Sequence, residues 1–401
     1  MQKFSGEQPS RYRVNLERRG FLMKHFLLSI FVFMMLIGCS DDQQPASKDA
    51  AGKQSAADLA AGKVVAERDC KGCHSLDGKG VAPGIPNLAG QWDRYLIVSL
   101  QEYKDGKRAH GALRDIASHL SEAEIRNVVA YFASLPPIAP APGQVFSPFD
   151  HGKALAPNCT KCHGDDGNSK TAGVPNLAGQ QPHYFVAATQ EYLNGARETS
   201  PMHSLIRSLN KLDLDSVALF FASQTPTQRA APSFGSPPAG EPLTRLCAGC
   251  HGAHGVSTDS ATPGLASQEA QYLVNSIKAY RNKRRHEAMQ LAIAALSDKD
   301  IENIAAFYTV QKSRAAEDGQ TLVRELTDRC NRCHSAETGA ASVAFPRING
   351  QDKDYLTMAL RAYRDGRRQS SVMHNMSVPY GDAIVESLAS FYAAQAPKKS
   401  K

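Results

Sequence analysis

Three features are scarce in this chain: cysteines outside one short motif, long apolar runs, and an excess of charge of one sign. Its 401 residues include nine cysteines, and all but one fall in copies of a single short motif, so none is left for disulfides. The apolar run from Phe26 to Ile37 is too short to span a bilayer as a stable helix. The first 38 residues account for +4 of the net charge of +7, and no strong basic patch follows, so no nucleic-acid partner is expected.

What the chain has instead is four copies of Cys-x-x-Cys-His, which is typical of covalent haem c attachment. Two thiols three residues apart can bond to the two vinyl groups on one edge of a porphyrin, and the next histidine can reach the iron. Zinc sites and thioredoxin-like pairs also use paired cysteines, but they do not explain a histidine after every second cysteine. We therefore predict four covalently bound haems c, each with two cysteines and a proximal histidine: Cys70, Cys73 and His74; Cys159, Cys162 and His163; Cys247, Cys250 and His251; Cys330, Cys333 and His334.

The remaining cysteine, Cys39, ends a Leu-Ile-Gly-Cys sequence that resembles the lipobox of bacterial lipoproteins. The resemblance implies a signal peptide over residues 1–38, with Met23 as an alternative true start, a lipid on Cys39 and a tether over residues 39–55. The protein is then expected on the periplasmic side of a Gram-negative bacterium, where the lipid anchors it to the inner or the outer membrane. An uncleaved anchor or ordinary cleavage nearby is the alternative.

Four similar units follow, and we name them unit one to unit four: residues 56–138, 145–225, 238–312 and 315–397. Each haem motif is followed by a turn such as Pro86 to Gln91, by a helix that begins near an aromatic residue, and by a last helix. Little β-pattern is present, so the predicted fold class is all-α. The first two junctions are rich in proline, whereas the third, residues 311–317, is short, so units three and four are expected to pack closely.

Each unit resembles a class I c-type cytochrome, and the tandem resembles the two-haem cytochromes of the c-four type, over roughly residues 56 to 397. The resemblance implies four tandem cytochrome c domains, each a few helices wrapped around its haem. It implies that the first and last helices of each unit cross closely at a glycine: Gly62, Gly152, Gly240 and Gly319. It also implies that a proline carbonyl in each turn accepts a hydrogen bond from the proximal histidine: Pro86, Pro175, Pro263 and Pro346.

In this family a methionine approaches the iron from the loop before the last helix. Met202, Met289 and Met373 have matching places in units two, three and four, and Met376 is a nearby alternative to Met373. Ligation by histidine and methionine saturates the iron, which suits electron transfer rather than substrate binding.

Unit one departs from this pattern, because its aligned residue is Leu113 and no methionine follows His74 within the unit. His110 is the first candidate for the sixth ligand of haem 1, an open or water-bound iron is the second, and His119 is a poorer one. His286 has the place that matches His110, beside a suitable Met289, so a histidine there need not ligate.

The predicted function is an electron relay that passes single electrons between redox-protein donors and acceptors, such as a dehydrogenase or respiratory chain and a terminal acceptor. One alternative is a haem-dependent oxidoreductase with haem 1 as an open catalytic site, and another is the cytochrome subunit of a dehydrogenase complex. The densest basic run, residues 281–285, is interpreted as a solvated face or a neighbour of haem propionates, with docking as the alternative.

Overall fold

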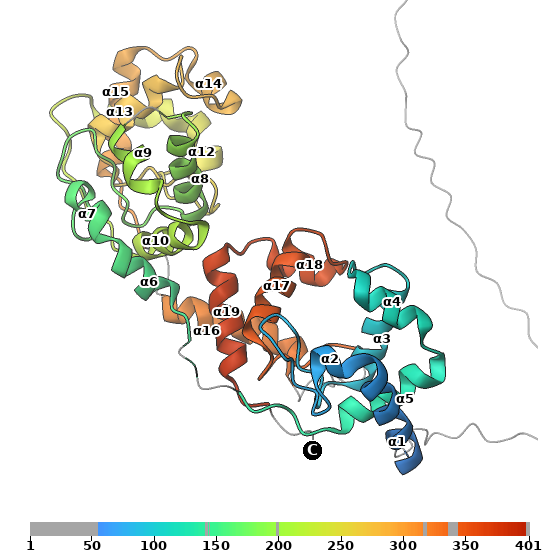
Figure 1. Cartoon of the computed structure of the whole chain (residues 1–401). Coiled ribbons are helices and arrows are strands. Elements are labelled where there is room, and N and C mark those ends of the chain that lie inside the picture. The colour runs from blue at the N-terminus through green and yellow to red at the C-terminus, as the bar shows by residue number, and fades with distance from the viewer. Residues whose placement is uncertain are drawn as a thin grey trace, which may run out of the picture. The chain divides into compact units, whose positions relative to one another are not determined.

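The computed structural model describes residues 55–140, 143, 145–197, 200–315, 319–335 and 344–397 (Figure 1). Within these ranges every regular element is a helix, and extended segments pair only at a single bridge between Arg108 and Arg368. The predicted all-α fold class is confirmed. None of the helices in these ranges is long and apolar enough to cross a bilayer. The expected signal peptide and the lipidated Cys39 lie outside the described residues.

All four units repeat one succession: a first helical segment that ends at the motif histidine, a helix after the turn, a short helix and a last helix. Unit one has α1 (Ala56–Val65), a π-helical turn (Ala66–Cys70), α2 (Lys71–His74), α3 (Asp93–Lys104), α4 (Gly111–His119) and α5 (Glu122–Ser134). Unit two has α6 (Pro148–Leu155), α7 (Pro157–His163), α8 (Pro182–Leu193), α9 (Ser200–Ile206) and α10 (Lys211–Ser223). Unit three has α11 (Pro237–Gly240), a 3-10 turn (Glu241–Thr244), α12 (Arg245–His251), α13 (Ala270–Ala279), α14 (Glu287–Ile293) and α15 (Asp298–Val310). Unit four has α16 (Gly319–His334), α17 (Lys353–Arg364), α18 (Ser371–Ser377) and α19 (Asp382–Ala394).

The first and last helices of a unit cross so closely that a side chain would not fit at the crossing. A methyl group on Gly62 would lie 2.0 Å from the carbonyl oxygen of Asn127 in α5. Gly152 and Gly240 meet the last helices of their units in the same way, at 2.1 and 2.0 Å. The close crossing is therefore confirmed at three of the four expected glycines, and Gly319 lies outside the residues whose side-chain surroundings are described.

Each unit has only a small apolar core of its own. In unit one the core lies where α1, α3 and α5 meet, and Leu96, Ile125 and Phe132 are buried in it. A domain of this size is marginally stable on side-chain burial alone. The helix α5 begins at the capping box of Ser121 and Glu124, which satisfies the first free N–H groups of the helix.

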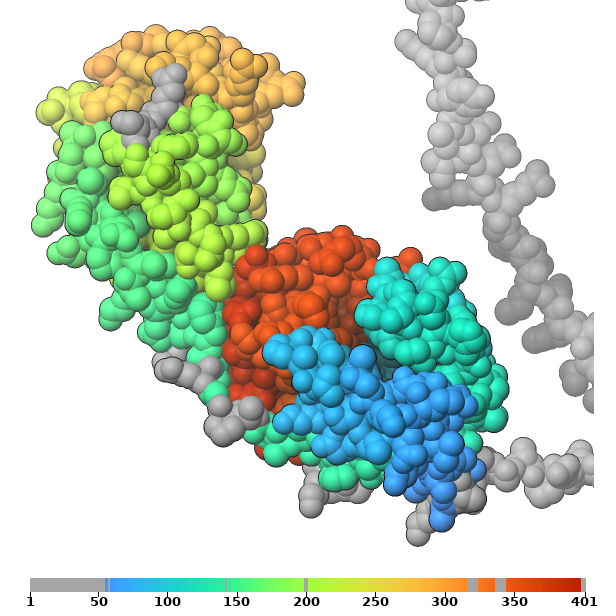
Figure 2. Space-filling view, viewed as in Figure 1, coloured from blue at the N-terminus to red at the C-terminus, as the bar shows by residue number. Residues whose placement is uncertain are grey.

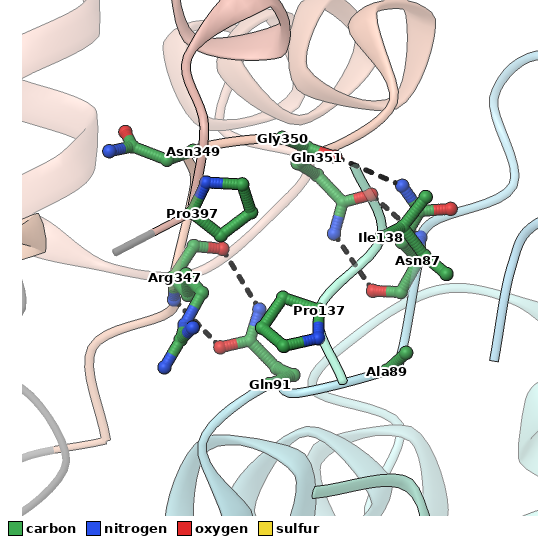
Figure 3. Close-up of a pocket in the computed structure, with 10 residues that line it drawn as sticks. All are labelled: Asn87, Ala89, Gln91, Pro137, Ile138, Arg347, Asn349, Gly350, Gln351 and Pro397. Atoms are coloured by element: carbon green, nitrogen blue, oxygen red, sulfur yellow. Dashed lines mark hydrogen bonds between the residues drawn. The ribbon is translucent and has the colours of Figure 1, made fainter. Parts of the chain in front are cut away.

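Hydrogen bonds between turns join unit one to unit four (Figure 3). The side-chain amide of Gln91 donates to the Arg347 carbonyl at 2.9 Å, and its oxygen accepts from the Arg347 N–H at 2.7 Å. Gln351 binds the backbone of Asn87 by the same exchange, at 2.9 and 2.6 Å. The surface of unit one, blue to cyan, lies directly against the orange and red surface of unit four (Figure 2).

Units two and three are joined by the same pattern. Gln268 accepts from the Asn176 N–H at 2.6 Å and donates to its carbonyl at 3.1 Å. Gln180 makes the matching exchange with Gly264, at 2.8 and 3.1 Å. Units two and three thus form one pair, and units one and four form the other. The first pair is inserted in the sequence between the two members of the second. These hydrogen bonds join unit three to unit two, and not to unit four as the sequence led us to expect.

The two pairs touch where α10 of unit two meets α19 of unit four. The backbone N–H of Asp382 donates to the carboxylate of Asp215 at 2.5 Å. Lys211 Nζ lies 3.4 Å from the carboxylates of both residues. Beside this polar contact, Leu219 of α10 packs against Leu388 and its apolar neighbours in unit four.

Candidate haem-binding sites

The proximal histidines share one contact in all four units. Nδ1 of the histidine lies within hydrogen-bond distance of the turn proline's carbonyl oxygen: 3.0 Å for His74 and Pro86, 2.8 Å for His163 and Pro175, 2.9 Å for His251 and Pro263, and 3.0 Å for His334 and Pro346. A carbonyl oxygen only accepts, so Nδ1 carries the proton and Nε2 keeps its lone pair. This predicted contact is confirmed, and it orients each imidazole as an iron ligand.

Burial keeps these imidazoles neutral. It lowers the pKa of His74 and likewise of the other three motif histidines, and the hydrogen bond to the proline carbonyl opposes it only in part. A neutral imidazole is the form that binds iron, so the site stays competent over the physiological range.

The motif cysteines lie on the last turns of their helices. Positions three apart share one helix face, which is where two bonds to one porphyrin edge are needed. In units one to three the first thiol of the motif is half-buried and the second is exposed. Burial raises the pKa of Cys70 and of Cys159 to about 11, so these sulfurs are protonated near neutral pH.

Zinc fits these thiols poorly, because a zinc site needs three or four protein ligands together. In the part of the chain that the structure describes, no group of three or more Cys, His, Asp or Glu side chains is placed to hold a metal ion. The geometry therefore favours haem attachment over the zinc alternative.

An arginine recurs five residues before each candidate sixth-ligand position, buried in units one and two and half-buried in units three and four, and the sequence analysis missed this repeat. The four are Arg108, Arg197, Arg284 and Arg368. The signal that would have found them was the constant spacing to Leu113, Met202, Met289 and Met373. Arg284 lies in the basic run 281–285, which the sequence analysis interpreted as a whole as a solvated face or a neighbour of haem propionates. Each guanidinium lies against tyrosine rings, for example 5.6 Å from the ring centre of Tyr95 for Arg108 and 4.5 Å from that of Tyr363 for Arg368.

In the pair of units one and four the buried Arg108 and the half-buried Arg368 form a cluster of excess positive charge. Arg108 is 8% exposed and forms an ion pair with Glu102 at 2.7 Å. Arg368 donates to the Tyr95 hydroxyl at 3.0 Å, and its Nε is buried without a hydrogen-bond partner among the described residues. Burial raises the pKa of Tyr95, but the two guanidinium groups outweigh this effect and lower it.

Such a cluster fits an anionic group that the chain itself does not supply. Haem c carries two propionate carboxylates, and arginine is the residue best suited to bind carboxylates. The thiols, the oriented histidine and the buried arginine together fit haem c, whose iron supplies single-electron chemistry when bound.

The candidate sixth ligands lie on the short helices α9, α14 and α18, and the leucine of unit one lies on α4. Met202, Met289, Met373 and Leu113 are all half-buried. Met376 is also half-buried and lies one turn after Met373 in α18, so it stays an alternative. The methionine assignments stay predictions, supported by this common placement.

Both candidate histidines of unit one are exposed and already bonded. His110 caps α4, where its Nδ1 accepts from the Leu113 N–H at 3.2 Å. The ring of His119 lies 2.6 Å from the carbonyl oxygen of Asp115, one turn earlier. The assignment of His110 as an iron ligand is therefore untested by the structure, which gives this side chain a different contact.

Comparison with known proteins gives the same family. Residues 59–136 match the family model described as Cytochrome c. A cytochrome c4 of Pseudomonas aeruginosa is 34% identical over 179 residues, which are 41% of this chain and 88% of that protein. A protein of Thiomonas intermedia described as thiosulfate dehydrogenase electron acceptor is 30% identical, over 40% of this chain and 82% of that protein. A solved structure of reduced recombinant cytochrome c4 from Pseudomonas stutzeri is 28% identical, with a TM-score of 0.37 over 41% of this chain and 98% of that one.

The residues that match the family model include the cysteine pair of unit one, His74 with its contact to Pro86, and Gly62 at the helix crossing. The cytochrome c4 relatives are matched over most of their length, while each match takes up about two-fifths of this chain. The chain belongs to the class I c-type cytochromes, is related to the two-haem cytochrome c4 family, and is an electron-transfer cytochrome with covalently bound haem c.

Proposed function

We propose that the chain carries four haems c, one in each unit. The observation that carries the proposal is the hydrogen-bond distance between the motif histidine and the turn proline, which recurs at 2.8 to 3.0 Å in every unit. The thiol pairs and the arginines that contact tyrosine rings recur with it. No unit lacks the residues that hold the cofactor on its proximal side.

The test is the ratio of haem to protein, measured by the pyridine haemochrome method and by intact mass. We expect four haems in the wild type and three after the double change Cys159→Ala and Cys162→Ala. The double change in the third motif, Cys247→Ala and Cys250→Ala, is the matched control and should also give three. A wild-type ratio below four overturns the proposal.

The protein acts, on this proposal, as a relay that takes single electrons from one redox protein and passes them to another. Support comes from Met202, Met289 and Met373, which would saturate three of the four irons and leave them suited to electron transfer. The relative described as thiosulfate dehydrogenase electron acceptor favours a dehydrogenase as the class of donor. A cytochrome subunit of a dehydrogenase complex would use the same chemistry with a permanently bound donor.

Stopped-flow absorbance tests the relay. The oxidised protein is mixed with thiosulfate alone, and then with thiosulfate and a purified thiosulfate dehydrogenase. Reduction only in the second mixture supports the relay, and reduction by thiosulfate alone supports the enzyme alternative. Failure in both mixtures excludes this donor class, and co-purification of a dehydrogenase with the tagged chain would identify the subunit alternative.

We also propose that a lipid on Cys39 anchors the protein at the periplasmic side of a membrane. The support is the sequence around Cys39 and the tether that follows it. Labelling with a fatty-acid analogue should mark the wild type and not Cys39→Ala, and fractionation should find the variant in the soluble periplasm. The same fractionation of the wild type separates the inner from the outer membrane.

A further inference from the structure

Unit one differs from units three and four at the third residue after the cap of its short helix. The N-cap residues His110, His286 and Ser370 have nearly the same backbone angles, with φ of −158°, −154° and −174° and ψ of 105°, 106° and 113°. The third residue after each cap donates its N–H to the cap side chain, at 3.2, 3.4 and 3.3 Å. The three short helices therefore begin alike.

Because the backbones match, Leu113 starts from the same place in its helix as Met289 and Met373 do in theirs. All three side chains are half-buried. A leucine side chain has the apolar bulk of methionine but no donor atom, so it can cover an iron without binding it.

His110 is held as a cap. Its Nδ1 accepts the Leu113 N–H, and its ring lies edge-on to Tyr103 with ring centres 6.1 Å apart. His286 has the same two contacts, with Met289 and with Tyr280 at 6.5 Å, in a unit that has its own methionine. The geometry of His110 is thus that of a histidine which does not need to ligate.

Other donor atoms near unit one are also engaged or lie on the proximal side. The exposed His119 ring faces the Asp115 carbonyl at 2.6 Å, and Lys104 Nζ donates to the Leu120 carbonyl at 3.2 Å. Met358 of unit four reaches unit one, but it lies beside Gly84, two residues before the proline that holds His74. Met358 therefore lies beside the turn that would hold the proximal histidine, and it is not a candidate for the sixth ligand.

We propose that no side chain among the described residues is the sixth ligand of haem 1, and that this site takes small neutral ligands of the carbon monoxide and nitric oxide class. The apolar side chain of Leu113 offers no hydrogen-bond donor to an anion, which favours small neutral molecules. The proposal concerns binding alone and requires only that unit one holds haem c, as its family match indicates.

The experiment is a carbon monoxide titration of the reduced full-length protein, followed by the Soret band, together with EPR of the oxidised protein. We expect one carbon monoxide per chain and one high-spin haem in the wild type. Leu113→Met should abolish both signals. Met289→Leu is the matched control, and should raise the stoichiometry to two.

His110→Ala separates this proposal from its rival. If His110 does not ligate, the variant keeps one carbon monoxide per chain. A wild type that is entirely low-spin and binds no carbon monoxide overturns the proposal, and a new site in His110→Ala would then identify His110 as the ligand. The haem content of the wild type and of each variant is measured separately, so a missing haem is not mistaken for a ligated one. A wild type with fewer than four haems would refute the proposed count and not the proposal on haem 1.

Discussion

Gln91 of unit one and Arg347 of unit four exchange two hydrogen bonds, in which a side-chain amide satisfies both backbone groups of one residue in the partner unit. Gln91 is 5% exposed, so water does not easily replace it. Gln351 does the same for Asn87 in the other direction. The interface between two units is therefore built from two equivalent halves.

Replacing Gln91 by alanine should weaken this interface. The backbone N–H and carbonyl of Arg347 would lose their two hydrogen bonds to the Gln91 amide, and two such bonds together contribute about 1–3 kcal/mol. Urea denaturation followed by circular dichroism measures the change in the free energy of unfolding. Gln101→Ala, at an exposed position on α3, is the control and should change stability by less than about 0.5 kcal/mol. Equal midpoints for both variants would show that the exchange contributes nothing.

The repeats, the haem motifs and the capping boxes could all be predicted, because each depends on residues close together in sequence. The pairing of the units could not be predicted, since all four turns run from a proline to a glutamine and any two of them look able to join. The short third junction pointed to units three and four, yet the bonds join units far apart in the chain. The residue after the turn glutamine does distinguish the two members of each pair. It is acidic in units three and four, where Glu269 accepts from the Gly173 N–H of unit two and Asp352 accepts from the Gly84 N–H of unit one.

The site was predictable to a similar extent. The histidine and proline contact followed from the family resemblance, and the structure confirms it in every unit. The four arginines were not predicted as site residues, because a basic residue is most often exposed to solvent. Only the folded pair shows that Arg108 and Arg368 meet tyrosines of two different units.

The crossing of α1 and α5 allows a direct test at Gly62. A methyl group there would lie 2.0 Å from the Asn127 carbonyl, so Gly62→Ala must push the helices apart. Overpacking of this kind costs about 1–3 kcal/mol, and urea denaturation should show it. Gly111→Ala is the control, because nothing lies within 4 Å of the added methyl group. The two variants behaving alike would argue against the close crossing.

The contact between the two pairs should depend on pH through Asp382. Burial raises the pKa of its carboxyl, but the hydrogen bond from Arg364 and the charges of Lys211 and Arg361 outweigh this and lower it below 3.8. The folded state therefore holds the ionised form more strongly than the unfolded state does. The stabilisation is fully present above about pH 4 and is lost as the pH falls through the folded pKa.

Urea midpoints of the wild type and of Asp382→Asn, measured from pH 7 down to pH 3, test this dependence. We expect the wild type to be more stable at pH 7, and the difference to shrink below about pH 4. Asp354→Asn removes an equally charged group at an exposed position of α17 and serves as the control. A difference that is constant over the whole range would contradict the assignment.

The choice between Met373 and Met376 in unit four can be decided from spectra. Met373 stands five residues after Arg368, as Met289 does after Arg284, whereas Met376 lies one helical turn further along α18. A thioether bound to ferric iron gives a weak sulfur-to-iron charge-transfer band in the near infrared. Met373→Leu should remove about one third of this band and add one carbon monoxide site, because three units have such a methionine. Met376→Leu replaces a neighbouring half-buried methionine on the same helix, and it should leave both readouts unchanged. The opposite result would assign Met376 to the iron and shift the ligand position of unit four by one helical turn.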